Sequence, residues 1–161
     1  MKSLMMAAAL AMAATGAQAQ SVTFGLGYTD YNEDAATNSA LLSLEYQHRP
    51  FYEGRVMSLG VGAALESDGE SDLFIGAGLA ANWSLRNDWF VEASVMPGYY
   101  DAASSANRLG GDFQIRSLLG VGRVLPNGNA ISVAAQHKSN ASTNDFNPGV
   151  NALLVRYRLA F

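Results

Sequence analysis

The amino-acid sequence predicts an all-β fold, an eight-stranded antiparallel transmembrane β-barrel of the kind found in bacterial outer membranes. Apolar and other residues alternate with period two in eight separate segments, which is typical of strands whose two faces meet different surroundings. Beyond the N-terminal segment, no stretch approaches the roughly 18 consecutive apolar residues of a membrane-spanning helix. The connections between the segments alternate between long and short, as outer loops and periplasmic turns do in such barrels.

Residues 1–19 are expected to be a secretory signal peptide. They contain one basic residue near the start, an apolar stretch over 4–14 and the small-x-small cleavage pattern Ala17-Gln18-Ala19. The apolar stretch is too short to cross a bilayer as a helix. The rest of the chain, 20–161, is therefore expected to form one exported domain, an outer-membrane β-barrel.

Composition narrows the class of this exported domain. Without the leader's Lys2 the chain has 9 basic and 14 acidic side chains, a net charge of −5. No basic stripe is present, which argues against nucleic acid as a partner. The chain has no Cys, so disulfides do not stabilise it. A soluble periplasmic domain and an outer-membrane barrel remain, and the alternation has to decide between them.

The eight alternating segments are long enough to be strands that cross a membrane at a tilt. Eight is also an even number and the smallest usual for a closed barrel of this type. Closure matters because an unpaired strand edge cannot face lipid. The expected strands lie around 22–28, 42–47, 59–65, 73–83, 89–95, 113–122, 131–136 and 153–161.

The lengths of the connections indicate which ends of the strands face outward and which face the periplasm. Counted from a periplasmic N-terminus, the odd connections are the longer, polar ones and the even connections are tighter, which is the expected asymmetry of outer loops and periplasmic turns. The longer ones cover 30–39, 66–72, 101–110 and 140–150, and the tighter ones lie around 49–54, 86–88 and 126–128.

A soluble lipocalin-like barrel is the alternative fold, with its apolar face inward. The non-apolar face carries fewer charged residues and more glycines than the exterior of a soluble barrel would. An enclosed polar lumen, in which these carboxylates and guanidiniums pair, fits the pattern better. Trp83 and Trp89 flank one short connection, where an interfacial aromatic girdle is expected. The charged residues of this face are Glu45, Glu92, Arg116, Arg156 and Arg158.

His137 and Ser139 are the candidate catalytic pair. They follow Ile131, Val133 and Ala135 on the face assigned to lipid, and an i, i+2 spacing on a strand places both side chains on the same side. An imidazole beside a hydroxyl is the minimal activated nucleophile, because the imidazole takes the proton as the oxygen attacks a carbonyl. The seventh strand runs outward, so the pair is expected at the level of the outer leaflet. A polar cap at the end of the strand is the alternative.

The string Gln136-His137-Lys138-Ser139-Asn140-Ala141, followed by Asn147-Pro148-Gly149-Val150-Asn151, resembles the lipid A 3-O-deacylase (acyloxyacyl hydrolase) family. The specific match covers about 25 C-terminal residues, and the terminal Phe161 resembles the last strand of bacterial outer-membrane proteins. The resemblance implies a carboxylic ester hydrolase that removes the 3-O-linked acyl chain of lipid A, with Ser139 as nucleophile and His137 as base. Asn140, with the backbone N–H groups just after it, would stabilise the oxyanion.

Position 151 departs from the family pattern. Better-known members have a Glu fourteen residues after the His, whereas this chain has Asn151. Asn151 shares the face of Leu153 and Val155, and its amide oxygen can accept the imidazole Nδ1 hydrogen bond, but it cannot stabilise the imidazolium by charge. A slower site, a substitute carboxylate such as Asp145, and an inactive relative of the deacylases all remain open.

The expected partners are lipid A and outer-membrane lipid, with a homodimer left open, and the proposed chemistry requires no cofactor and no metal. The main rival function is a non-catalytic structural or adhesive outer-membrane barrel, and a weaker one is a carrier of a small apolar ligand in the lumen. Asp68, Glu70 and Asp72 could gather a divalent cation, but a solvated acidic loop is the preferred interpretation. His48 is interpreted as a surface or interfacial residue.

Overall fold

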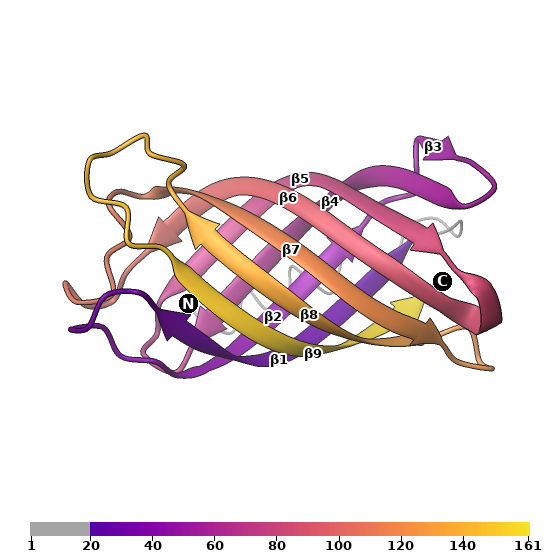
Figure 1. Cartoon of the computed structure of the whole chain (residues 1–161), viewed down its shortest axis with the longest axis horizontal. Coiled ribbons are helices and arrows are strands. Elements are labelled where there is room, and N and C mark those ends of the chain that lie inside the picture. Colours follow the sequence, from indigo (N-terminus) through magenta and orange to yellow (C-terminus); the bar gives the residue numbers. More distant parts are fainter. Residues whose placement is uncertain (1–19) are drawn as a thin grey trace.

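The computed structural model describes residues 20–161, which form one closed antiparallel β-barrel (Figure 1). Each long strand pairs with its neighbours in sequence, and β1 pairs with β9 to close the wall. The predicted fold class is therefore confirmed, while the expected leader, 1–19, lies outside the described residues. The eight long strands are β1 (Ser21–Tyr31), β2 (Ala40–Gln47), β4 (Met57–Asp68), β5 (Leu73–Ser84), β6 (Trp89–Asp101), β7 (Phe113–Val124), β8 (Ala130–Ser139) and β9 (Val150–Ala160).

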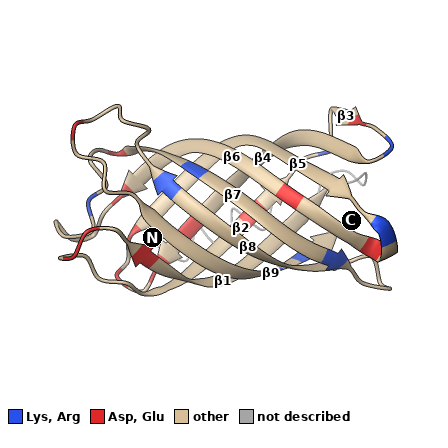
Figure 2. Cartoon of the chain, in the orientation of Figure 1, with Lys and Arg blue, Asp and Glu red and all other residues tan. Residues whose placement is uncertain are grey.

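The two faces of the wall follow the period-two pattern of the sequence. Apolar side chains such as Leu26, Leu119 and Leu153 are exposed on the outside, where a bilayer would cover them. The charged positions gather mostly at the two ends of the barrel and leave long stretches of the wall without charge (Figure 2). Within 20–161 no helix is long and apolar enough to span a membrane.

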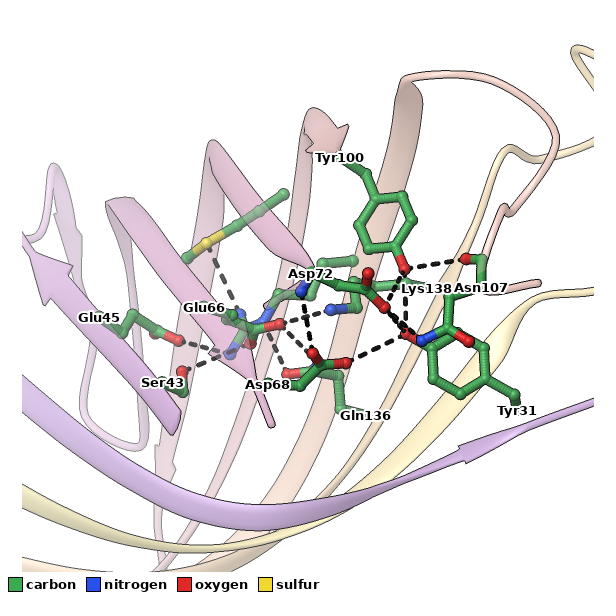
Figure 3. A network of polar contacts seen from close by, with 12 residues as sticks. Tyr31, Ser43, Glu45, Glu66, Asp68, Asp72, Tyr100, Asn107, Gln136 and Lys138 are labelled. Carbon is green, nitrogen blue, oxygen red and sulfur yellow. Dashed lines mark hydrogen bonds and ion pairs between the residues drawn. The ribbon is translucent and has the colours of Figure 1, made fainter. Parts of the chain in front are cut away.

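The lumen is filled by a charge-balanced set of three acidic and three basic side chains, part of which is seen in Figure 3. Arg116 is fully buried; its Nε lies 2.7 Å from Glu66 Oε1 and its Nη2 lies 3.0 Å from Glu45 Oε2. Pairing of this kind offsets the large desolvation penalty of each buried charge. The set comprises Glu45, Glu66, Glu92, Arg116, Lys138 and Arg156.

The second outer connection is shorter than predicted. β4 continues to Asp68 and β5 begins at Leu73, so the expected loop 66–72 is reduced to 69–72. The carboxylates of this segment suggested a solvated loop, but Glu66 and Asp72 point into the barrel and are buried. Charge alone cannot distinguish a lumen position from a loop position, and this is why the sequence-based boundary was wrong.

The acidic residues at this connection take part in a hydrogen-bonded cluster rather than a cation site. Tyr31 Oη donates to Asp72 Oδ2 at 2.8 Å, Asn107 Nδ2 donates to the same oxygen at 2.6 Å, and Tyr100 Oη lies 3.1 Å from it (Figure 3). In the described part of the chain, no group of three or more His, Cys, Asp or Glu is arranged to hold a metal ion. The cluster instead ties the connection between β6 and β7 to the outer ends of β1, β5 and β6.

The opposite end of the barrel holds the tighter connections. A short strand β3 (Tyr52–Glu53) pairs with β4 inside the connection between β2 and β4 and was not predicted, and the 3-10 turn η2 (Arg86–Asp88) joins β5 to β6 (Figure 1). At the other end, the longer connections 32–39, 102–112 and 140–149 surround the end of β8 and the start of β9. The candidate pair lies at this loop-rich end.

Candidate active site

β8 places His137 and Ser139 on the outer wall, as the alternation predicted. His137 is exposed and Ser139 half-buried, whereas the intervening Lys138 points inward and is buried. His137 stands between Ser117 of β7 and Asn151 of β9, its direct partners in the antiparallel pairing. Had His137 turned into the lumen, attack on a membrane lipid would have been excluded; its orientation leaves that chemistry open.

The imidazole is held by Asn151. His137 Nδ1 lies 2.8 Å from Asn151 Oδ1, and an amide oxygen can only accept, so Nδ1 carries the hydrogen. This leaves Nε2 with its lone pair free, which is the tautomer that a general base needs. Asn151 is brought here by the direct pairing of β8 with β9, and the two residues are fourteen apart in sequence.

Ser139 and His137 share the outer side of β8 but do not form a hydrogen bond with each other. Among the hydrogen bonds of residues 20–161, none joins the Ser139 hydroxyl to the imidazole. Two residues along a strand separate the Cα atoms by about 6–7 Å, and the ring is engaged on the β9 side by Asn151. Catalytic hydrogen bonds are often long without substrate and shorten in the Michaelis complex, so the missing bond does not exclude Ser139 and His137 as a pair.

Gly149 forms one side of the imidazole pocket, and the sequence analysis did not single it out as a site residue. Its φ of +70° lies in the left-handed region, and a Cβ added to it would lie 2.9 Å from His137 Cε1 and 3.4 Å from Nε2. A side chain here would therefore press against the reactive edge of the ring. The Gly-Val pair that follows Pro148 in the sequence was the available signal.

The backbone just after Ser139 turns sharply. Ala141 and Ser142 have φ values of 52° and 61°, a left-handed conformation that is uncommon for residues with a side chain. Thr143 N donates to Asn140 O at 3.1 Å, whereas the N–H groups of Ala141 and Ser142 have no acceptor within the described residues. Strained backbone of this kind concentrates at active sites, and free backbone N–H groups are suitable donors to an oxyanion.

Asn140 has a different setting from the one expected for an oxyanion donor. Its side chain is fully buried, and Nδ2 donates to the carbonyl oxygens of Leu109, Gly110 and Phe146 at 2.8 to 3.0 Å. Its backbone N–H donates to Asn147 Oδ1. Because its N–H groups are already engaged, Asn140 holds two outer loops together beneath the turn. The donors that remain available are the backbone groups after it.

A shallow apolar groove of about 270 Å³ lies on the outer wall below the pair. Val121 of β7 and Val133 of β8 face each other in the pairing and line it, together with Val91, Leu119 and Gly120. Val133 is four residues from His137 along β8, a distance of about 13 Å. The groove therefore lies on the side of the pair that faces the membrane interior.

Comparisons with known proteins identify the family of this barrel. The family model described as lipid A 3-O-deacylase (PagL) matches residues 18–160. The crystal structure of the outer membrane enzyme PagL aligns with a TM-score of 0.68 and 18% identity, over 88% of this chain and 99% of that one.

Two other barrels share the fold alone. A de novo designed transmembrane β-barrel has a TM-score of 0.58 and 11% identity over 91% of this chain and 98% of its own, and Neisserial surface protein A has 0.57 and 9% over 89% and 96%. A search of curated proteins gave no match. The family model covers nearly all of the domain, whereas the solved structures show its architecture. The chain therefore belongs to the lipid A 3-O-deacylase (PagL) family of bacterial outer-membrane β-barrels.

Proposed function

We propose that this protein is an active outer-membrane serine esterase that hydrolyses the 3-O-linked acyl chain of lipid A. Ser139 attacks the ester carbonyl, His137 Nε2 takes the hydroxyl proton, and the backbone N–H groups of Ala141 and Ser142 stabilise the oxyanion. His137 then donates the proton to the sugar oxygen as the ester bond breaks, and water hydrolyses the acyl-enzyme by the same acid–base route. The 2.8 Å bond from His137 Nδ1 to Asn151 Oδ1, on the lipid-facing wall, is the observation that carries this proposal.

The position of the pair suits a substrate that approaches laterally from the outer leaflet. The exposed imidazole stands at the loop-rich end of β8, and the apolar groove at Val121 and Val133 lies about 13 Å further along the same wall. An acyl chain lying in that groove would place its ester at the level of Ser139 and exchange lipid contacts for contacts with the wall. Holding the ester against the nucleophile in this way supplies much of the rate enhancement of an enzyme.

Lipid A from a Gram-negative host that expresses the full chain tests the activity directly. Mass spectrometry is expected to show lipid A that has lost one hydroxyacyl group, with the free fatty acid released, because the reaction adds water across a single ester. Lipid A from cells carrying an empty vector is the control. An unchanged lipid A profile in cells whose outer membrane contains the folded barrel would contradict the proposed function.

Asn151→Ala is expected to lower kcat on the order of 10- to 100-fold, the range for loss of a partner that orients an imidazole, and so less than the loss of either His137 or Ser139. The amide orients the ring but supplies no charge, so its removal costs orientation alone. Initial rates of fatty-acid release from lipid A in detergent micelles measure this difference. Equal and complete losses in Asn151→Ala and His137→Ala would contradict the assigned ranking.

A further inference from the structure

Asn151 does not hold the imidazole alone, because its own amide is bonded to the β1–β2 connection. Asn151 Nδ2 donates to Asn32 Oδ1 at 3.3 Å, and Asn32 Nδ2 donates to the backbone carbonyl oxygen of Pro148 at 2.8 Å. The Asn32 backbone N–H also donates to Gly149 O at 3.3 Å. Asn32 therefore lies behind Asn151, on the side away from His137, and contacts both ends of the segment that leads into β9.

An amide at position 151 raises a problem that a carboxylate would not. A carboxylate presents an acceptor oxygen to His137 in either orientation, whereas an amide turned by 180° presents its NH₂ group. The flipped amide would donate to Nδ1 and move the ring hydrogen to Nε2. In that tautomer Nε2 has no lone pair with which to take the Ser139 proton. Activity with Asn151 therefore requires something that fixes which way the amide faces.

Asn32 can fix the orientation of the Asn151 amide, because the hydrogen bonds from the Pro148 carbonyl through Asn32 to Asn151 can be formed in one direction only. The Pro148 carbonyl can only accept, so Asn32 must turn its Nδ2 toward it and its Oδ1 toward Asn151. Asn151 must then present Nδ2 to Asn32 and Oδ1 to His137. A flip of the Asn151 amide would turn its oxygen toward Asn32 Oδ1, so that two acceptors face each other. It would also turn its NH₂ group toward His137 Nδ1, where two donors face each other whenever Nδ1 keeps its hydrogen.

We propose that Asn32 is a positioning residue that sets the catalytic tautomer of His137 by orienting the Asn151 amide against the Pro148 carbonyl. This inference rests on the proposed function for its kinetic consequences, but the tautomer itself is a property of the substrate-free barrel. The carboxylate of better-known relatives offers an acceptor oxygen to the imidazole in either orientation. In this chain Asn32 ensures the same acceptor by holding the Asn151 amide in one orientation.

Nitrogen-15 NMR of the full barrel in detergent micelles tests the tautomer without any assay of activity. The chain contains two His residues, so His48 serves as an internal reference for His137. Wild type is expected to show the Nδ1–H form at His137, and Asn32→Ala a substantial population of the Nε2–H form.

Kinetics provide the second readout. Asn32→Ala is expected to lower kcat about tenfold, the low end of the loss seen when an outer partner that orients a ligating imidazole is removed. In an Asn151→Asp background the same change should have little effect, because an aspartate needs no orientation. Asn38→Ala is the matched control: Asn38 lies in the same connection and has two side-chain hydrogen bonds there, but none to a site residue, so it should leave both tautomer and kcat unchanged.

Three results would overturn the inference: an unchanged His137 tautomer in Asn32→Ala, an equal kinetic loss in the Asn151→Asp background, or the same loss in Asn38→Ala. The last two would indicate damage to the loop rather than a loss of orientation. Failure of the proposed function would look different. In that case wild type would release no fatty acid, while the NMR experiment would still report whether Asn32 controls the ring.

Discussion

Ser139→Ala and His137→Ala are each expected to abolish deacylation of lipid A, with kcat falling on the order of 10⁴- to 10⁶-fold. A nucleophile and its base act as one unit, so removal of either leaves only what binding and the oxyanion donors provide. Release of the hydroxyacyl chain from lipid A, followed by mass spectrometry with the purified barrel in micelles, measures the loss. Both variants should remain folded, because these side chains lie on the outside of the wall and support no part of the lumen network.

Ser117→Ala is the matched control for the nucleophile. Ser117 is an exposed serine on the same outer wall, and it faces His137 directly from β7. The backbone groups beside Ser117 are hydrogen-bonded within the sheet, because Ser117 lies inside a paired strand. Ser139, in contrast, precedes a turn in which the N–H groups of Ala141 and Ser142 are free. Activity should therefore persist in Ser117→Ala. The reverse outcome, an active Ser139→Ala and an inactive Ser117→Ala, would move the nucleophile to β7.

The alternation of the sequence was sufficient to predict the barrel and the face of each candidate residue. Parity along a strand places His137, Ser139 and Asn151 on the lipid side without any knowledge of long-range pairing. The register of β8 against β9, which sets His137 directly opposite Asn151, agrees with this. Parity is robust because a slip of one residue would turn every apolar side chain of a strand into the lumen.

What parity could not predict is which residues approach from other parts of the chain. Asn32 lies 119 residues from Asn151, in a polar connection with no pattern of its own. Asn140 was assigned by resemblance, but its contacts with Leu109 and Gly110 depend on the packing of two loops. Loop conformation follows from tertiary contacts rather than from hydrophobic period, so such roles emerge only in three dimensions.

The lumen charges were partly foreseen for the same reason. Inward parity placed Glu45, Glu92, Arg116, Arg156 and Arg158 together, and the first four do pair. Arg158 instead donates a hydrogen bond to Asn82 Oδ1 at 2.9 Å. Glu66, which was assigned to a loop, is instead a central acceptor for Arg116 and for Lys138. The sequence can predict that charged side chains from several strands meet in the lumen, but it cannot predict which of them pair with each other.

Arg116→Met is expected to destabilise the barrel by about 3–5 kcal/mol, the usual result of removing one partner of a buried ion pair. The guanidinium is fully buried and donates to Glu45, Glu66 and Gln136. Methionine fills much of the volume but leaves the two carboxylates with one basic partner each, Arg156 for Glu45 and Lys138 for Glu66. Urea-induced unfolding of the barrel in lipid vesicles measures the free energy change.

Arg108→Met is the control for loss of an arginine as such. Arg108 is exposed in the connection between β6 and β7, and an exposed substitution of this kind should change the free energy of unfolding by no more than about 0.5 kcal/mol. Adding Glu45→Gln to Arg116→Met should recover part of the loss, because Arg156 keeps Glu92 and Lys138 keeps Glu66 as partners. The non-additivity of the two changes measures the coupling of Arg116 with Glu45. Full stability in Arg116→Met alone would show that the lumen charges do not hold this barrel together. Since the network faces inward and His137 faces lipid, the folded fraction of Arg116→Met should keep its deacylation rate.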